Sequence, residues 1–201
     1  MRVGVLGGTF DPIHLAHLIV AEEARVRLAL DHVVFIPAGE PWLKAVQPVT
    51  PPQVRLEMVR QAVACNSHFR VSSLEVERPG PSYSVDTLDT LRQEEGPDAE
   101  LYFILGMDAI ADLPHWHAPE RFLELCTPVV FARTDHGAAG LDELEHRLPG
   151  VKNRATFLEG PVIEISSTDI RRRVALGESI RYLVPTPVER FITEHGLYSQ
   201  E

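Results

Sequence analysis

The chain has 201 residues, enough for one α/β domain with a sizeable core, and its 44% apolar and 24% charged residues are typical of a globular protein rather than a disordered or fibrous one. The 19 Lys and Arg residues against 29 Asp and Glu residues give a formal net charge of −10, which argues against a nucleic-acid-binding groove. No apolar run approaches the roughly 18 residues that a membrane helix needs, and glycines interrupt the N-terminal segment before the core of a signal peptide could form. We therefore expect a single domain, residues 1–201, that acts in the cytoplasm and binds neither nucleic acid nor membrane.

Predicted strands and helices alternate along the chain. Apolar, β-branched runs predict strands over residues 3–6, 33–37, 69–74, 101–105, 129–132 and 162–165. Helical periodicity predicts helices over residues 15–30, 52–65, 84–95, 141–148, 167–176 and 187–195, several of which open with a proline or a capping residue. This alternation is typical of α/β proteins, and we expect a Rossmann-like, doubly wound, mostly parallel sheet with helices on both faces.

The first predicted helix, residues 15–30, has the pattern of an amphipathic helix. Leu18, Ile19, Glu22, Val26 and Leu30 recur near steps of four and eight residues, and charged residues occupy the other side. This pattern predicts that the apolar side packs against the core.

Two cysteines are too few for a disulfide framework in a chain of this length. Cys65 and Cys126 also lack the spacing of a metal or redox motif. We expect both to be buried thiols.

The loop after the first predicted strand is where a ligand is expected, because α/β sheets bind ligands at the carboxyl ends of their strands. The loop reads GGTFDPIHLAH over residues 7–17, which matches neither the G-x-G-x-x-G nor the G-x-x-x-x-G-K-[ST] phosphate-binding pattern. Gly7 and Gly8 have no Cβ to keep backbone N–H groups away from a phosphate, and they permit a positive φ where a turn needs one. Adjacent glycines are also common in ordinary turns, so this pair alone does not establish a site.

His14 and His17 are three residues apart at the start of the helix that follows, so both side chains can lie on one side. There the two side chains lie next to the unpaired N–H groups of the first turn, whose partial positive charge favours a phosphate. A metal site needs more ligands than this pair provides, and we predict none. A purely structural pair of histidines is the alternative, but the place of the pair behind the two glycines favours phosphate contact.

A second candidate anion site reads ISSTDIR over residues 165–171. Hydroxyl groups at Ser167 and Thr168 follow a predicted strand end, and Arg171 lies one turn into the next predicted helix. Taken alone, these residues also fit an ordinary helix N-cap beside an exposed arginine. Two such segments at one edge of a sheet favour a ligand with several phosphates.

These two segments resemble the signature sequences of the nucleotidylyltransferase superfamily, and within it the chain is most similar to the bacterial nicotinate-nucleotide adenylyltransferases. The resemblance rests on residues 7–12 with the H-x-x-H of residues 14–17, and on residues 165–171. Further matches are Pro37-Ala38-Gly39, Lys44, Arg55, Met58, Glu77, Tyr83-Ser84, Thr87-Leu88, Gly106, Asp108, Trp116 and Tyr182-Leu183-x-Pro185. The resemblance extends over nearly the whole chain, from Val3 to about Gly196.

The resemblance implies transfer of AMP from ATP to nicotinate mononucleotide, giving deamido-NAD and pyrophosphate, by in-line attack of the mononucleotide phosphate on the α-phosphate of ATP. It implies that His14 and His17 are the catalytic donors to the phosphates. Contacts to ATP are implied for Gly7, Gly8, Thr9, Phe10, Gly106, Asp108, Ser167, Thr168 and Arg171. Contacts to nicotinate mononucleotide are implied for Lys44, Tyr83, Ser84, Thr87 and Trp116. Mg²⁺ is implied as a cofactor that binds through the ATP phosphates, without a protein ligand that we can name.

The chain departs from the family pattern at three places. Ala16 stands where the family motif has glycine between the histidines, and Ser84 replaces threonine but keeps the hydroxyl. The run Pro41-Trp42-Leu43 precedes Lys44 in place of the commoner Pro-Pro-aromatic run.

Other functions stay open on the sequence. Nicotinamide mononucleotide could take the place of nicotinate mononucleotide, because the sequence does not orient the groups that separate an acid from an amide. Pantetheine phosphate is the weaker alternative, because the enzymes of that branch resemble this chain less: they are usually shorter and have a different residue in place of His14. A non-catalytic regulator would bind ATP without turnover, although the intact histidines and the intact Ser-Ser-Thr segment speak against it. Residues 134–140 predict a loop that either closes over the ligand or is simply exposed.

Overall fold

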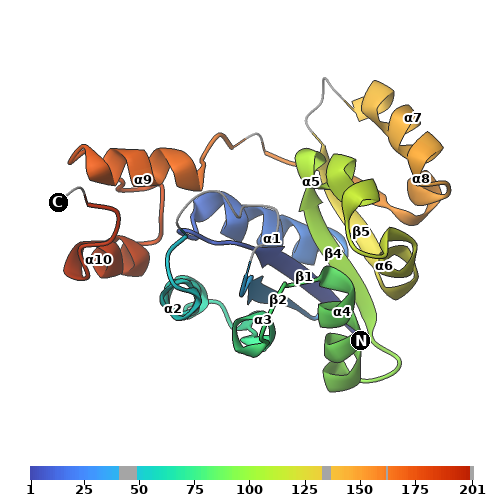
Figure 1. Cartoon of the computed structure of the whole chain (residues 1–201), viewed down its shortest axis with the longest axis horizontal. Coiled ribbons are helices and arrows are strands. Elements are labelled where there is room, and N and C mark those ends of the chain that lie inside the picture. Colours follow the sequence, from blue (N-terminus) through green and yellow to red (C-terminus); the bar gives the residue numbers. More distant parts are fainter. Residues whose placement is uncertain (41–48, 133–136, 162, 200–201) are drawn as a thin grey trace.

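A computed structural model gives the fold and describes residues 1–40, 49–132, 137–161 and 163–199. Over these residues, six strands form one sheet in the order β3-β2-β1-β4-β5-β6, and every neighbouring pair is parallel (Figure 1). The strands are β1 (Arg2–Gly8), β2 (His32–Pro37), β3 (Phe69–Val71), β4 (Glu100–Gly106), β5 (Thr127–Ala132) and β6 (Thr156–Glu159). The strand order reverses between β1 and β4, as in doubly wound sheets, and this confirms the Rossmann-like architecture.

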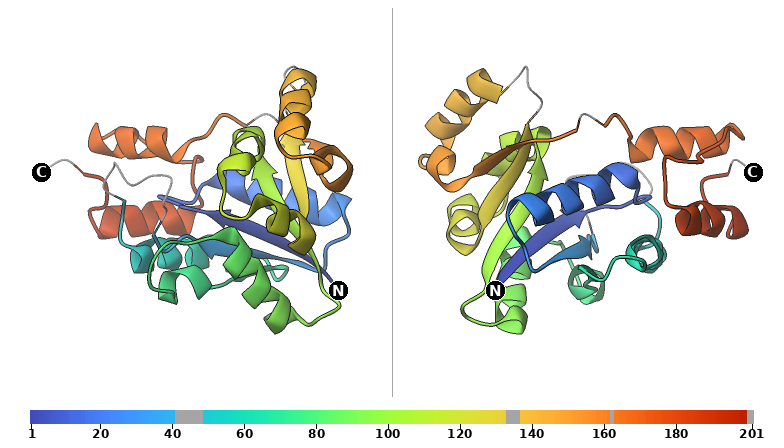
Figure 2. Two further views of the ribbon diagram at one scale, coloured as in Figure 1. Left: turned by 45° about the vertical axis from the view of Figure 1, so that its right-hand side comes forward. Right: turned by 180° about the vertical axis from the view of Figure 1, so that it is seen from behind.

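Helices cover both faces of the sheet. They are α1 (Leu15–Arg27), α2 (Pro52–Val63), α3 (Leu74–Glu77), α4 (Ser84–Glu95), α5 (Met107–Asp112), the 3₁₀ helix η2 (Leu113–His115), α6 (Pro119–Leu125), α7 (Gly137–Arg147), α8 (Val151–Arg154), α9 (Ser167–Ala175) and α10 (Thr186–Glu194). Figure 2 shows α1 in front of the sheet in the view from behind, whereas α4 and α6 lie in front in the other view. Among the described residues, no helix is long and apolar enough to span a membrane.

Two apolar clusters flank the sheet, because successive side chains of a strand point to opposite faces. On β4, Phe103 and Leu105 belong to the first cluster, whereas Tyr102 and Ile104 belong to the second. Helices α4 to α8 complete the first cluster, and α1, α2, α9 and α10 complete the second. A sheet buried on both sides explains the continuous apolar runs of its strands.

Each predicted helix has a counterpart in the structure, but α3, α5, α6 and α8 were not predicted, and two predicted strands differ from those observed. The run over residues 69–74 ends as a strand at Val71 and continues into α3. The sixth strand is β6, not the predicted residues 162–165: residues 163–165 belong to no strand, and residue 162 lies outside the described part. Thr156 pairs with Val129 of β5, and this distant partner decides which of the two short runs becomes the strand.

The apolar side predicted for the helix over residues 15–30 is confirmed only in part: Leu18 packs against the second cluster and Leu30 is 3% exposed, but two other members face outward. Val26 is 61% exposed and Ile19 is 36% exposed, whereas Ala21 and Ala24 are fully buried. Alanine has no side chain beyond Cβ, so this face lets the helix backbone lie close to the sheet. The small alanines, which the apolar pattern left out, therefore belong to the buried face as well.

Two further predictions are corrected. Cys126 is buried as expected, but Cys65 is exposed just after the end of α2. Residues 137–140, expected in a loop, form the first turn of α7, and residues 134–136 lie outside the described part. The helix that was predicted from residue 141 therefore begins at residue 137.

The start of α1 faces segments from the far end of the chain. Helices α9 and α10 lie beside it at one end of the molecule, and α7 and α8 lie at the opposite end (Figure 1). The main-chain N–H of Leu15 donates to the main-chain oxygen of Leu183 at 3.0 Å. The carboxyl edge of β1 is therefore enclosed by elements that are distant in sequence.

Candidate active site

The two glycines that end β1, Gly7 and Gly8, serve close packing rather than a positive φ. Neither Gly7 nor Gly8 has φ in the left-handed region. A Cβ on Gly8 would lie 3.1 Å from the ring of Phe10, and one on Gly7 would lie 3.2 Å from the ring of Phe103. Phe10 itself has a φ of 49 and is 2% exposed, so its ring anchors the loop in the core. Larger residues in place of the glycines would push these rings aside.

His14 and His17 lie together at the start of α1. Their rings stack with centroids 3.7 Å apart, and the main-chain N–H of His14 donates to Nδ1 of His17 at 3.2 Å. Because Nδ1 accepts this hydrogen bond, neutral His17 carries its proton on Nε2. The ring of Phe10 packs edge-on against His17 with centroids 5.0 Å apart, which fixes the plane of the imidazole. The pair thus presents a ring N–H at a helix N-terminus, where an anion is favoured.

His14 is neutral at pH 7 because it is buried. His14 is only 5% exposed, and this burial lowers the pKa of its imidazole from 6.5 to about 4. The folded-state pKa lies below the unfolded value, so the unfolded chain takes up the proton first as the pH falls. The stability that neutral His14 contributes is complete above pH 6.5 and is lost as the pH falls towards 4.

Replacing His14 should weaken this sensitivity to acid. Between pH 7 and pH 4.5, we expect the free energy of unfolding of the wild-type protein to fall by about 2 kcal/mol more than that of His14→Gln. Urea denaturation at the two pH values measures the difference. His68→Gln, at an exposed histidine, is the matched control and should behave like the wild type. Equal losses in all three proteins would contradict the assignment of His14 as a buried neutral base.

The second predicted anion segment docks onto the loop after β1. Oγ of Ser167 donates to the main-chain oxygen of Pro12 at 2.9 Å, and Nη1 of Arg171 donates to that of Asp11 at 2.7 Å. The residue that caps α9 through its side chain is Ser166, one position before Ser167. The two segments, distant in sequence, thus meet at the carboxyl edge of β1.

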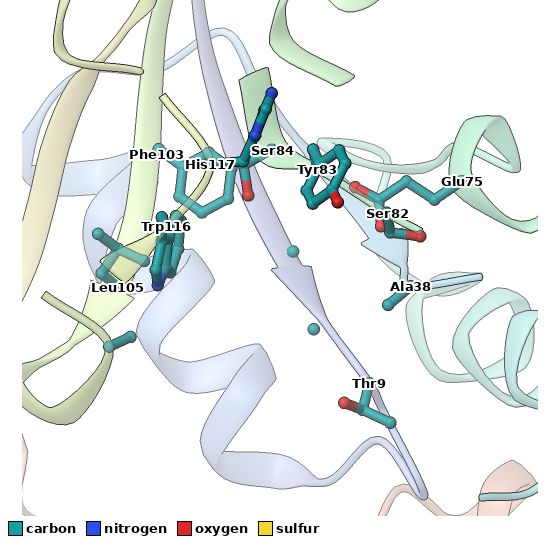
Figure 3. A pocket seen from close by; sticks show the side chains of 13 residues that line it. Thr9, Ala38, Glu75, Ser82, Tyr83, Ser84, Phe103, Leu105, Trp116 and His117 are labelled. Carbon is teal, nitrogen blue, oxygen red and sulfur yellow. The ribbon is translucent and has the colours of Figure 1, made fainter. Parts of the chain in front are cut away.

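A cavity opens beside this edge, where the strand order reverses between β1 and β4 (Figure 3). Its lining residues are Gly7, Gly8, Thr9, Ala38, Glu75, Ser82, Tyr83, Ser84, Phe103, Leu105, Ala109, Trp116 and His117. The volume is about 210 Å³. Pockets for drug-sized ligands have roughly 300–1,000 Å³. The cavity therefore fits one ring with its substituents rather than a whole dinucleotide.

Aromatic side chains form the walls of the cavity (Figure 3). Trp116 stands edge-on to Phe103 and Phe122, with centroids 6.2 Å and 5.4 Å away. Its Nε1 is buried and has no hydrogen-bond partner within the described part of the chain. Tyr83 and His117 stack on each other with centroids 4.4 Å apart. These contacts hold the rings in place and give the cavity a rigid surface for a planar group.

A buried acid, Glu75, lines the same cavity. It is 8% exposed, and Oγ1 of Thr87 donates to its Oε1 at 2.8 Å. Burial raises the pKa of Glu75, and the hydrogen bonds from Thr87 and Ser82 oppose that rise. The sequence had singled out Glu77, which is exposed at the end of α3. Only the position of α3 decides which of these two acids turns inward.

Several predicted contact residues lie outside the cavity lining. Thr87 is 1% exposed, and its hydroxyl also accepts from Nη1 of Arg78 at 3.1 Å, so it supports the cavity wall from behind. Gly106, Asp108 and Thr168 are exposed, and Lys44 lies outside the residues that the structure describes.

The lining also contains residues that the sequence did not single out. They include Ser82, Phe103, Leu105, Ala109 and His117. Ser82 and His117 are chain neighbours of the predicted Tyr83 and Trp116, so adjacency was the available signal. Phe103 and Leu105 belong to a strand, and only the strand's register shows which face they take.

Comparison with known proteins agrees with this geometry. Residues 5–173 match the family model described as cytidylyltransferase-like. A protein named as a probable nicotinate-nucleotide adenylyltransferase from Roseiflexus sp. (strain RS-1) is 50% identical over 196 residues, which cover 98% of this chain and 97% of that protein. One of the same name from Dehalococcoides mccartyi (strain CBDB1) is 42% identical over 201 residues, which cover 100% of this chain and 98% of that protein.

A solved structure with the same fold is the Plasmodium falciparum nicotinic acid mononucleotide adenylyltransferase complexed with NaAD. It has a TM-score of 0.79 at 19% identity, over 98% of this chain and 97% of that chain. With relatives of 42% and 50% identity along its whole length and a family model over most of it, the chain belongs to the nicotinate-nucleotide adenylyltransferase family of cytidylyltransferase-like proteins.

Proposed function

We propose that this chain transfers AMP from ATP to nicotinate mononucleotide, giving deamido-NAD and pyrophosphate. The observation that carries the proposal is the direct bonding of the two anion segments beside the aromatic cavity, through Ser167 to Pro12 and through Arg171 to Asp11. One surface then receives phosphates while the adjoining cavity receives a ring. Such a layout suits two nucleotides that meet phosphate to phosphate. Because ATP is the donor, we place the reaction in the cytoplasm.

The reaction needs positioning and charge stabilisation rather than a base. The attacking phosphate oxygen is ionised at neutral pH, and it must lie in line with the bond between the α-phosphorus and the leaving pyrophosphate. His14 and His17 stand at the N-terminus of α1 and donate to the phosphate oxygens on which negative charge grows. As a neutral group, His14 binds there without an unpaired charge buried in the resting enzyme.

The start of α9 is assigned to the leaving pyrophosphate. Arg171 uses Nη1 to bond the main-chain oxygen of Asp11, which fixes the direction of its guanidinium. A guanidinium has further N–H groups, and these suit the oxygens of the leaving group. Ser167 and Thr168 lie in the first turn of α9, one turn before Arg171, and complete this end of the site. The backbone of Gly7, Gly8 and Thr9 approaches the phosphates from β1.

We infer that Mg²⁺ binds through the triphosphate rather than through a cluster of protein ligands. Within the described part of the chain, no group of three or more His, Cys, Asp or Glu side chains could hold a metal. Mg²⁺ is often held by substrate phosphates and water, and such binding needs few protein carboxylates. The ion supplies charge neutralisation on the phosphates when it is bound. His14, His17 and Arg171 would orient the phosphate oxygens beside such an ion.

The aromatic cavity is assigned to the pyridine ring and its ribose. Trp116 offers a fixed ring face, and its buried Nε1–H suits an acceptor on the bound molecule. Tyr83 and Ser84 lie on the opposite side, at the start of α4 (Figure 3). The size of the cavity matches a single ring with its substituents. ATP then occupies the open surface towards α9.

Trp116→Ala should raise the KM for nicotinate mononucleotide about tenfold or more, because the stacking of a base on an aromatic side chain is worth about 1–3 kcal/mol. The KM for ATP should change little and serves as the internal control. Trp116→Phe keeps an aromatic face and should retain most of the affinity. Steady-state kinetics with each substrate varied in turn measure both constants. Equal increases in the two KM values would show that Trp116 does not bind the mononucleotide specifically.

Pyrophosphate release from ATP and Mg²⁺ tests the function itself. The assay is run with nicotinate mononucleotide and, separately, with nicotinamide mononucleotide, and the two kcat/KM values are compared. We expect the acid to be strongly preferred. Equal values would indicate an adenylyltransferase with dual specificity. ATP binding without turnover on either acceptor would overturn catalysis and favour a nucleotide-binding regulator.

A further inference from the structure

The carboxylate of Asp11 is held by parts of the chain that are far from it in sequence. Asp11 lies in the loop between β1 and α1, shortly before His14, and it is 5% exposed. Its Oδ2 accepts from the main-chain N–H of Thr50 at 3.2 Å, and its Oδ1 accepts from the hydroxyl of Tyr198 at 2.7 Å. Arg171 binds the main-chain oxygen of the same residue at 2.7 Å. These bonds determine where the loop stands, and therefore where the two histidines stand.

Arg55 holds the loop from inside the protein. It is 1% exposed, and its guanidinium donates to the main-chain oxygens of Thr9, Gly39 and Thr50 at 2.6, 3.0 and 2.8 Å. Burial lowers the pKa of Arg55, and the negative charge of Asp11 opposes that change. Asp11 and Arg55 are thus a buried pair of opposite charges behind the loop. A carboxylate in this position needs every donor that it has.

Tyr198 reaches Asp11 from the segment that follows α10. Its φ is 64, a left-handed conformation that is unfavourable for tyrosine and persists only where contacts hold the residue. The ring packs against the second apolar cluster, and its hydroxyl lies 4.0 Å from Sδ of Met58. Burial, followed by the hydrogen bond to Asp11, raises the pKa of Tyr198. The hydroxyl therefore keeps its proton and remains a donor at working pH.

We propose that Tyr198 is a positioning residue for adenylyl transfer, whose hydroxyl fixes Asp11 and thereby the loop that presents His14 and His17. The proposal rests on the proposed function. Tyr198 is not among the described residues that line the cavity, so it acts through Asp11 rather than by touching the substrate. Without the hydroxyl, Oδ1 of Asp11 loses its donor inside the protein and the loop can shift. In-line transfer is sensitive to small displacements of the donors.

The test is Tyr198→Phe, which removes the hydroxyl and keeps the ring. We expect kcat to fall about tenfold while the KM values of both substrates stay within about threefold, because the bound phosphates are then misaligned with the histidines. Tyr182→Phe is the matched control, since Tyr182 is 82% exposed, and it should keep the wild-type kcat. In the resting enzyme labelled with ¹⁵N-histidine, the imidazole signals of His14 and His17 should shift in Tyr198→Phe and stay in place in Tyr182→Phe.

A double-mutant cycle identifies the route of the effect. In an Asp11→Ala background, Tyr198→Phe should lower kcat no further, because the hydroxyl has lost its acceptor. A wild-type kcat in Tyr198→Phe, or unshifted histidine signals, would overturn the proposal even if Asp11→Ala does not fold. A lower melting temperature with normal kcat per folded molecule would show a merely structural role and would overturn it too. If the wild type itself shows no turnover, the proposed function fails, and the histidine signals still report whether Tyr198 positions the loop.

Discussion

His17→Ala is expected to fold and to lose about a hundredfold in kcat, which corresponds to roughly 3 kcal/mol of transition-state stabilisation. The hydrogen bond that Nδ1 accepts from the main chain of His14 places the ring proton on Nε2. The edge-on contact with Phe10 and the stacking on His14 fix the direction of that N–H. A fixed donor at a helix N-terminus acts most strongly on charge that grows during the reaction. The KM values should therefore change less than kcat. Steady-state kinetics give kcat at saturation with both substrates and each KM with that substrate varied. Turnover near the wild-type value would remove His17 from the mechanism.

The same histidine also closes the first turn of α1, so stability and catalysis must be separated. His17→Ala leaves the N–H of His14 without its acceptor and should lower the stability by about 1 kcal/mol. In His17→Gln the side chain can accept this N–H, as glutamine does at the third position of many helices. The NH₂ of glutamine, however, lies at the end of a flexible chain rather than in a rigid ring, so glutamine does not hold its donor where Nε2–H lies. We expect His17→Gln to restore the stability and not kcat, and His68→Ala, on the surface, to change neither.

The fold could be predicted where local signals mark the end of an element. Helix α4 has the bounds predicted from the sequence. Gly96, with a φ of 104, and Pro97 end it, whereas at its start the N-cap is Tyr83 and Ser84 is the first helical residue, with no side-chain cap. Strand β6 has no such marks. The pairing of Thr156 with Val129 decides its place, and a short apolar run does not show which partner it will meet.

The site could be predicted where the chemistry lies in the side chains themselves. His14, His17 and Arg171 are recognisable by type, and the topology of a parallel sheet brings the ends of its strands to one edge. The residues that hold these side chains in place could not be predicted in this way, because their role depends on which other residues they contact in the folded chain. Tyr198 and Asp11 are 187 positions apart, and no periodicity or motif relates them. Long-range hydrogen bonds of this kind are visible only in the folded chain.

Arg55 carries the largest expected effect on stability. Arg55→Met should lower the free energy of unfolding by about 3 to 5 kcal/mol, the cost typical of removing one partner from a buried ionic network. Methionine fills a similar space but donates no hydrogen bond, so the carbonyls of Thr9, Gly39 and Thr50 lose a donor at once. Asp11 also loses the positive charge nearby. Urea denaturation of the purified proteins measures the loss.

Two further variants show whether the loss comes from the network or from helix α2. Arg60→Met, on the same helix, replaces an arginine whose side chain is 55% exposed and lies 4.0 Å from Glu57, and it should change the stability by no more than about 0.5 kcal/mol. Arg55→Lys keeps the charge, but a single ammonium group does not reproduce a planar fork aimed at three carbonyls, so we expect an intermediate loss. A loss below about 1 kcal/mol in Arg55→Met would mean that the three segments hold their places without the guanidinium. A large loss confined to Arg55 would mean that this buried cation assembles the mouth of the site, because Thr9 lines the cavity and Gly39 directly follows its lining residue Ala38.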